Sequence, residues 1–103
     1  MSKKRRQELK RLYGELFEQI SAVLFAADPI GIKFESNTDE YDPEAGTIIP
    51  RLRECCSAED ARRVVYEEFV GWFGADIAGP EQTYEQPARE IWQLWQRTVG
   101  GKA

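Results

Sequence analysis

Apolar residues recur every three or four positions through the first quarter of the chain, which is the spacing of one face of an α-helix. The stripe consists of Leu9, Leu12, Tyr13, Leu16, Phe17, Ile20, Val23 and Leu24. Gly14 costs a helix about 1 kcal/mol relative to Ala, but the stripe continues on both sides of it. The pattern predicts one long helix over residues 4–27. It should end near Asp28, because Pro29 moves the preceding residue out of the helical region.

The longest connection follows this helix, over residues 28–41. Ile30, Ile32 and Phe34 alternate with small or polar residues, which is typical of a short extended segment with one buried face. No partner strand is apparent in the sequence. We therefore expect a loop that is held down by its apolar side chains.

A second helix is predicted to begin at Pro43, with Asp42 as its N-cap and Glu44 in its first turn, and to end near Cys55. Its inward positions are Ile48, Ile49 and Leu52. Pro50 lies inside this segment and would remove one backbone hydrogen bond. The sequence thus favours either a kinked helix or two short turns.

A third helix is predicted after Ser57, with Asp60 in a position like that of a capping box and Gly74 as terminator. Its apolar stripe is Ala61, Val64, Val65, Phe69, Trp72 and Phe73. A fourth helix is predicted over residues 81–99, and Pro87 in its first two turns is a place where the regular part can begin. Its stripe is Tyr84, Ala88, Ile91, Trp92, Trp95 and Val99.

Four helices, short links and no convincing strand pair predict an all-α fold. We expect a four-helix small domain, an irregular bundle with a long loop after the first helix and a kinked second helix. A length of 103 residues indicates one domain over residues 1–103.

Charge is distributed unevenly along the chain. The formal net charge is -4, yet residues 1–11 hold six cations and one acid, and residues 12–103 hold eight cations and 17 acids. An acidic body repels nucleic acid and anionic membranes and attracts basic proteins. The basic start is interpreted as the solvated first turns of the first helix, with phosphate contact as the alternative.

The residue types present exclude several kinds of chemistry. The chain has no histidine, which removes Ser-His and Cys-His nucleophile pairs and the commonest transition-metal ligand. Cys55 and Cys56 are adjacent, so we expect two free thiols, one of them packed in the core, and a reducing, cytoplasmic location. No apolar run approaches the ~18 residues of a membrane span. We expect neither an enzyme nor a cofactor.

Carboxylates are concentrated just before and within the second predicted helix, with no Lys or Arg between Lys33 and Arg51. The acids are Glu35, Asp39, Glu40, Asp42 and Glu44. A calcium loop does not fit, because starting at Asn37 puts Tyr41 at the fifth position and starting at Asp39 puts Pro50 at the twelfth. We expect no metal. A looser divalent site and an acid–base pair of Asp39 and Asp42 remain as alternatives.

Two motifs in this region resemble a known group of proteins. Asp28-Pro29-Ile30-Gly31 is followed by Asp39-Glu40-Tyr41-Asp42, and Ser57-Ala58-Glu59-Asp60 opens the third helix. The pattern is similar to small bacterial α-helical domains of unknown function with DPIG and DEYD motifs, over roughly residues 10–74. The resemblance implies a helical, non-enzymatic, cytoplasmic domain, and some similar proteins look like immunity proteins encoded beside toxins. The basic start and the tryptophan-rich fourth helix depart from the pattern.

We therefore expect an acidic binding protein that neutralises a basic protein partner, as an immunity protein for a nuclease-like bacterial toxin. Direct binding to nucleic acid or to a membrane is not expected. The predicted contact residues are Glu35, Asp39, Glu40, Tyr41, Asp42 and Glu44. Asp42 also starts a helix and Tyr41 is expected to pack, so the three acids before them are the first to test.

The three tryptophans separate this hypothesis from its alternative. Trp72, Trp92 and Trp95 lie on the inward stripes, so core packing is expected, and an exposed aromatic anchor is the other interpretation. The alternative function is a homo-oligomeric structural or regulatory accessory domain, for instance a homodimer formed through the tryptophan-bearing fourth helix.

Overall fold

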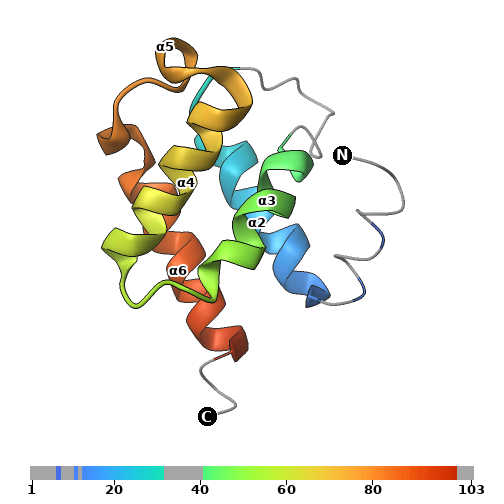
Figure 1. Cartoon of the computed structure of the whole chain (residues 1–103). Helices are drawn as coiled ribbons and strands as arrows, with labels where there is room; N and C mark the ends of the chain where they lie inside the picture. Colours follow the sequence, from blue (N-terminus) through green and yellow to red (C-terminus); the bar gives the residue numbers. More distant parts are fainter. Residues whose placement is uncertain (1–6, 8–10, 12, 32–40, 100–103) are drawn as a thin grey trace.

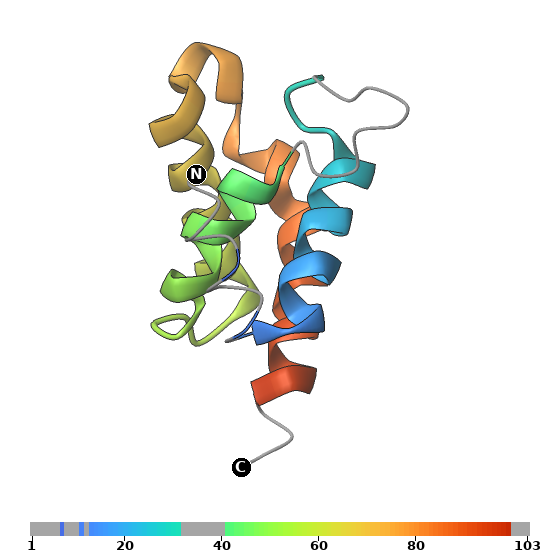
Figure 2. The same ribbon diagram turned by 90° about the vertical axis from the view of Figure 1, so that its right-hand side faces the viewer.

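The computed structural model describes residues 7, 11, 13–31 and 41–99, and these residues form helices and links with no strand among them. The elements are α2 (Glu15–Ala27), α3 (Asp42–Leu52), α4 (Ala58–Phe73), α5 (Ala75–Ala78), the 3-10 helix η1 (Glu81–Tyr84) and α6 (Glu85–Val99). The described chain is an all-α bundle, as predicted. Contacts run from α2 to α3, α3 to α4, α4 to α6 and α6 back to α2, so each of these four helices packs against two others (Figures 1 and 2).

The first predicted helix is interrupted at Gly14. This residue has a φ of 54°, and α2 begins immediately after it. Gln7, Arg11 and Tyr13 are helical as well, but a positive φ cannot continue a right-handed helix, and glycine adopts it without a steric penalty. One unbroken helix over residues 4–27 is therefore wrong.

The end of α2 agrees with the prediction. Asp28 takes a left-handed conformation with a φ of 45°, and its N–H donates to the carbonyl oxygen of Leu24 at 2.8 Å. Ile30 packs partly buried against the core. The predicted burial of Ile32 and Phe34 lies outside the described residues.

The second predicted helix is a single helix that starts one residue early and ends sooner than expected, at Leu52. Tyr41 is the N-cap and makes no side-chain cap bond, so the prediction of Asp42 as N-cap is wrong. Pro43 lies in the first turn, where no intrahelical N–H bond is needed. Pro50 lies near the C-terminal end without dividing the helix into two turns.

Local signals placed α4 correctly. The Ser57 hydroxyl accepts a hydrogen bond from the Asp60 N–H at 3.2 Å, and Oδ2 of Asp60 accepts one from the Cys56 N–H at 2.9 Å. The Asp60 side chain thus accepts from the N–H of Cys56, the residue before the N-cap. In a standard capping box, a Glu at this position accepts from the N–H of the N-cap residue itself. Gly74, with a φ of 86°, ends the helix. The short helix α5 that follows was not predicted.

The fourth predicted helix consists of η1 and α6. Pro87 is the third residue of α6, where its missing N–H leaves no helical bond unmade. The regular helix therefore begins two residues before this proline.

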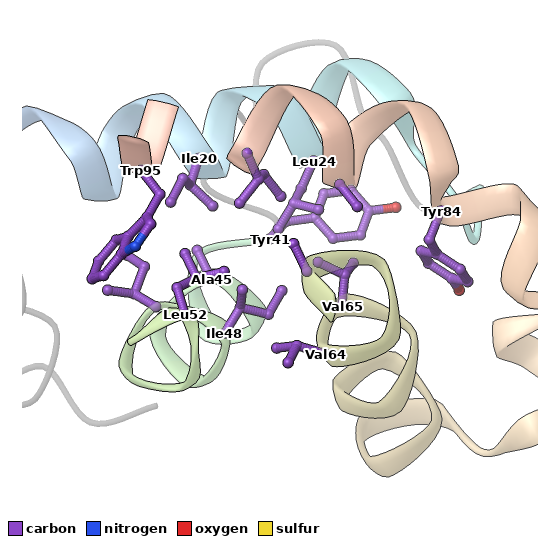
Figure 3. Close-up of a cluster of buried hydrophobic side chains, with 14 of the residues drawn as sticks. Ile20, Leu24, Tyr41, Ala45, Ile48, Leu52, Val64, Val65, Tyr84 and Trp95 are labelled. Carbon is purple, nitrogen blue, oxygen red and sulfur yellow. The ribbon is translucent and has the colours of Figure 1, made fainter. Parts of the chain in front are cut away.

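The core joins all four long helices (Figure 3). Tyr41, Phe69 and Tyr84 are fully buried, and Phe69 lies 5.8 Å from Tyr41 and 5.0 Å from Tyr84 between ring centroids. Trp95 is also buried, as predicted, and Trp92 packs partly buried against the core. The aromatic contacts tie the start of α3 to α4 and η1.

Candidate functional site: the α3–α4 seam

The six predicted contact residues divide into two groups. Glu35, Asp39 and Glu40 lie outside the described residues. The other three belong to the start of α3 and are buried: Tyr41 is 0%, Asp42 7% and Glu44 3% exposed. A contact surface requires exposed side chains, so we remove these three from the contact set.

The buried polar groups at the start of α3 hold it against α2. The Tyr41 hydroxyl donates to Oδ1 of Asp28 at 2.7 Å, and the Ser21 hydroxyl donates to Oδ1 of Asp42. A buried carboxylate without hydrogen bonds would cost several kcal/mol. The bond from Ser21 explains how Asp42 can lie inside the bundle, and the burial of Asp42 excludes it from an acid–base pair on the surface.

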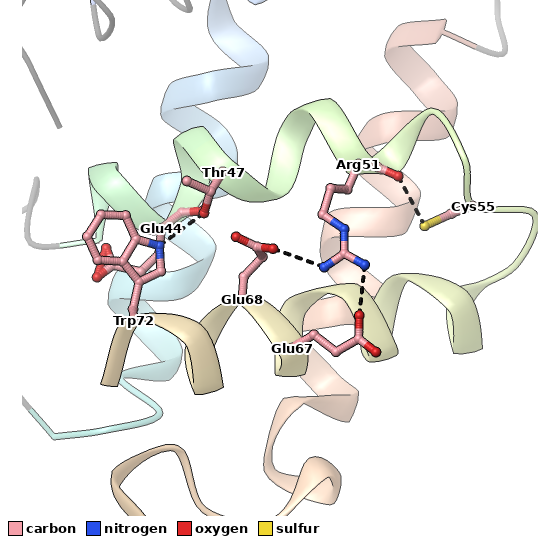
Figure 4. Close-up of polar contacts among 7 residues, drawn as sticks. All are labelled: Glu44, Thr47, Arg51, Cys55, Glu67, Glu68 and Trp72. Atoms are coloured by element: carbon pink, nitrogen blue, oxygen red, sulfur yellow. Dashed lines mark hydrogen bonds and ion pairs between the residues drawn. The ribbon is translucent and has the colours of Figure 1, made fainter. Parts of the chain in front are cut away.

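A different set of polar side chains lies on the surface between α3 and α4. We call it the α3–α4 seam, and it consists of Thr47, Arg51, Glu67, Glu68 and Trp72 (Figure 4). Thr47 and Arg51 come from successive turns of α3, and the other three come from the second half of α4. Helix packing therefore brings together residues that lie 16 to 25 positions apart in sequence.

Arg51 is the centre of the seam. Its Nη2 lies 2.7 Å from Oε1 of Glu67, and its Nη1 lies 2.9 Å from Oε2 of Glu68. The hydrogen bond to Glu67 and the contact with Glu68 raise the pKa of the Arg51 guanidinium against the opposing effect of its partial burial. Two carboxylates share one cation, so the seam keeps one net negative charge.

Trp72 closes the other end of the seam. Its Nε1–H donates to the hydroxyl oxygen of Thr47 at 3.0 Å, while 41% of the residue stays exposed. The prediction that Trp72 packs in the core is therefore wrong. The bond to Thr47 leaves the indole on the surface and fixes its orientation (Figure 4).

A second group of charges lies between α4 and the segment that leads into α6. Arg62 contacts Glu81 at 3.1 Å and Glu85 at 3.7 Å, and Arg63 contacts Glu81 at 3.7 Å. A shallow hollow lies beside these pairs and is lined by Ala58, Glu59, Arg62, Glu85 and Arg89. The hollow contains two cations and two acids, so it offers a ligand no net charge.

The cysteines and carboxylates of the described residues bear on nucleophilic and metal chemistry. The Cys55 and Cys56 thiols are free, as predicted, and Cys55 packs against the core. Burial, followed by the charge of Asp60, raises the pKa of the Cys55 thiol, which keeps it protonated and less reactive. Within the described ranges no three His, Cys, Asp or Glu side chains gather as they would around a metal ion.

Short sequence motifs do not predict the seam, but the distribution of charge along the chain indicates the helix that supplies its acids. Residues 64–88 contain five acids and no Lys or Arg. The acids are Glu67, Glu68, Asp76, Glu81 and Glu85. This stretch is as free of cations as the acidic run near residue 40, and it supplies most of the charge on the second half of α4, α5 and η1.

Comparisons with protein-family models, with curated proteins and with solved structures found no match to this chain. In the part of the chain that is described, no helix combines the length and the apolar character needed to cross a membrane. The function of the protein therefore has to be inferred from its own geometry and charge.

Proposed function

We propose that this protein is an acidic binding protein that neutralises a basic protein partner. The observation that carries the proposal is the α3–α4 seam, where Glu67 and Glu68 hold a guanidinium at hydrogen-bond distance and one negative charge remains. Charge-assisted bonds to guanidinium are the main way in which carboxylates recognise arginine. The same two carboxylates can bind a partner arginine beside or in place of Arg51.

The charge of the whole chain supports the same proposal. Residues 12–103 hold eight cations and 17 acids, so the body of the protein attracts basic surfaces over distances comparable to the Debye length. Such attraction increases the rate of association and makes it sensitive to salt. A partner with little charge would not associate faster because of this acidic charge.

We further propose that the partner is a nuclease-like bacterial toxin, and that this chain is its immunity protein in the cytoplasm. A toxin that acts on nucleic acid must present cations where phosphate binds, and an acidic protein can cover those cations. The resemblance of the DPIG and DEYD motifs to domains that include immunity-like proteins supports this choice. The free thiols of Cys55 and Cys56 suit a reducing compartment.

The alternative, a homo-oligomeric accessory domain, depended on the tryptophans of α6. Trp95 is 8% exposed and Trp92 is partly buried against the core, so this helix offers a second copy little aromatic surface. A sizing measurement at several protein concentrations decides between the two functions. A stable dimer without any toxin would favour the alternative.

The direct test is neutralisation of the product of the neighbouring gene, which the proposal expects to be a toxin with a nuclease-like domain. We expect the purified protein to form a one-to-one complex with the purified toxin domain and to stop its cleavage of nucleic acid. The Glu67→Gln/Glu68→Gln double variant should need a higher concentration for the same inhibition. A Glu15→Gln/Glu90→Gln variant removes the same charge from α2 and α6 and serves as control.

Two results would contradict the proposal. Cleavage that continues at full rate with the protein in excess would exclude an immunity function. Equal loss of inhibition in the seam variant and in the control would show that only total charge matters and that the seam is not the contact.

A further inference from the structure

Two large hydrophobic side chains are exposed where α4 leads into α5. Trp72 is 41% exposed and Ile77 is 59% exposed. Scattered exposed apolar residues are normal, but Trp72 is held in place by its bond to Thr47. An aromatic side chain that is already ordered loses little entropy on binding, which favours an interface role.

Gly71, immediately before Trp72, adds an independent observation. It lies exposed in the interior of α4, its φ is not in the left-handed region, and a Cβ built on it would meet nothing within 4 Å. Glycine destabilises the interior of a helix relative to alanine. The fold gains nothing from glycine at this position, whereas a molecule that approaches the α4 backbone closely would need it.

The charge of this region indicates what kind of molecule approaches. Residues 64–88 carry five acids and no cation. Asp76 is exposed on α5 and makes no ion pair with the described residues. Glu68 lies one helical turn before Trp72 and is one of the two carboxylates on Arg51. An apolar contact flanked by carboxylates is complementary to an apolar side chain flanked by Arg or Lys.

We propose that Gly71, Trp72 and Ile77 form the docking patch for the basic partner. The partner's backbone or a short side chain approaches α4 at Gly71, an apolar side chain packs against Trp72 and Ile77, and a flanking Arg or Lys faces Asp76 and Glu68. A cation over the face of Trp72 would add to the attraction. This inference rests on the proposed function and names the surface through which it acts.

The test compares a variant that stabilises the free protein with one that removes the aromatic contact. Gly71→Gln introduces an uncharged side chain of larger size at this position. Because Gln has a higher helix propensity than Gly, we expect Tm to rise by a few degrees. Affinity for the purified toxin domain, measured by titration calorimetry, should nevertheless fall at least about 10-fold. Trp72→Ala should weaken binding at least about 30-fold, as truncation of an interface hot spot does.

The matched control is Ala22→Gln, which places the same side chain at an exposed position in the middle of α2. It should bind the toxin domain as the wild type does. Hydrogen exchange provides a second measurement that requires no substitution. In the complex, amides of residues 67–78 should exchange more slowly, while those on the exposed side of α2 should not change.

The outcomes separate this inference from the proposed function. The docking patch would be wrong if the wild type binds and both Gly71→Gln and Trp72→Ala bind with the same affinity. It would also be wrong if slower hydrogen exchange is confined to other helices. Either result would leave the acidic binding function in place. Absence of wild-type binding to the toxin domain would overturn the proposed function and the patch together. A more stable Gly71→Gln variant with weakened binding supports both.

Discussion

At the scale of single residues, burial decides what each polar group does. Asp42 and Tyr41 belong to a charged run that points to a binding surface, yet both are buried and hydrogen-bonded across the α2–α3 contact. Arg51, by contrast, is not part of any motif, and it is the residue that organises two surface carboxylates. The identity of a residue in sequence therefore says less about its role than its neighbours in space.

Tyr41→Phe tests the structural role of the buried hydroxyl. The substitution keeps the ring in the core and removes the hydroxyl that donates to Asp28. We expect the free energy of unfolding to fall by about 1 kcal/mol, measured by urea unfolding. Toxin neutralisation should stay unchanged, because the hydroxyl is not on the surface. Reduced neutralisation with normal stability would return Tyr41 to the contact set.

Tyr84 predicts how stability depends on alkaline pH. Burial, with a smaller contribution from Tyr66, raises the pKa of Tyr84 to about 12 from the ordinary value of 10.0, and its hydroxyl donates to the carbonyl oxygen of Ala78 at 2.5 Å. The folded state holds this proton more tightly than the unfolded state. The stabilisation is therefore complete below about pH 10 and is lost as pH rises through about 12.

Unfolding measured at several pH values checks this prediction with Tyr84→Phe as the comparison. The variant should be less stable by about 1 kcal/mol at neutral pH, because the hydrogen bond is lost. Between pH 10 and 12 its stability should fall less steeply than that of the wild type. Parallel curves for the two proteins would show that Tyr84 does not titrate in this range.

At the scale of helices, two glycines have opposite effects on helices that look alike in sequence. Gly14 takes a φ of 54° and interrupts the first predicted helix, whereas Gly71 lies in an unbroken α4. The apolar stripe continues through both positions, so periodicity predicts a helix at each. Only the backbone conformation distinguishes a glycine that the fold requires from one that it tolerates.

Alanine at each position should change stability in opposite directions. Gly71→Ala should stabilise the free protein by about 0.5–1 kcal/mol, because it improves helix propensity in open space. Gly14→Ala should destabilise it by about 1 kcal/mol, because a left-handed backbone is strained with a Cβ. Thermal unfolding of both variants shows whether each substitution raises or lowers stability. Stabilisation by Gly14→Ala would mean that the two helical segments can join into one.

Helix ends could be predicted from sequence where the determining contacts are local. The Ser57 cap, the stop at Asp28 before Pro29 and the Gly74 terminator involve residues within a few positions of one another. The apolar stripes also predicted most of the core. The seam could not be predicted, because Arg51 meets Glu67 and Glu68 only after α3 and α4 have packed.

The exposure of Trp72 shows the same limit for a single side chain. Its spacing places it on the inward stripe of α4, near Phe69, yet it lies at the edge of that stripe, where Thr47 of the neighbouring helix accepts its N–H. The spacing of apolar residues predicts which side of a helix faces the core, but it does not predict how far around the helix the buried surface extends. Residues at the edge of a stripe are therefore the ones whose exposure requires the neighbouring helix to be known.

At the scale of the whole molecule, the sequence combines a basic N-terminal segment, residues 1–11, with an acidic remainder, residues 12–103. Residues 1–11 contain six of the 14 cations, and the second half of α4, α5 and η1 contain none. The proposed partner should therefore approach the α4–α5 side of the bundle, where Figure 1 places α5 at one end of the molecule. Salt should slow this approach more than it changes the lifetime of the complex.

The most direct measurement is the association rate constant with the purified toxin domain as a function of ionic strength. We predict that the rate constant for the wild type falls steeply as salt is raised. The slope should be shallower for Glu67→Gln/Glu68→Gln and close to that of the wild type for Glu15→Gln/Glu90→Gln. An association rate that does not depend on salt, or a slope that the seam substitutions leave unchanged, would contradict the account.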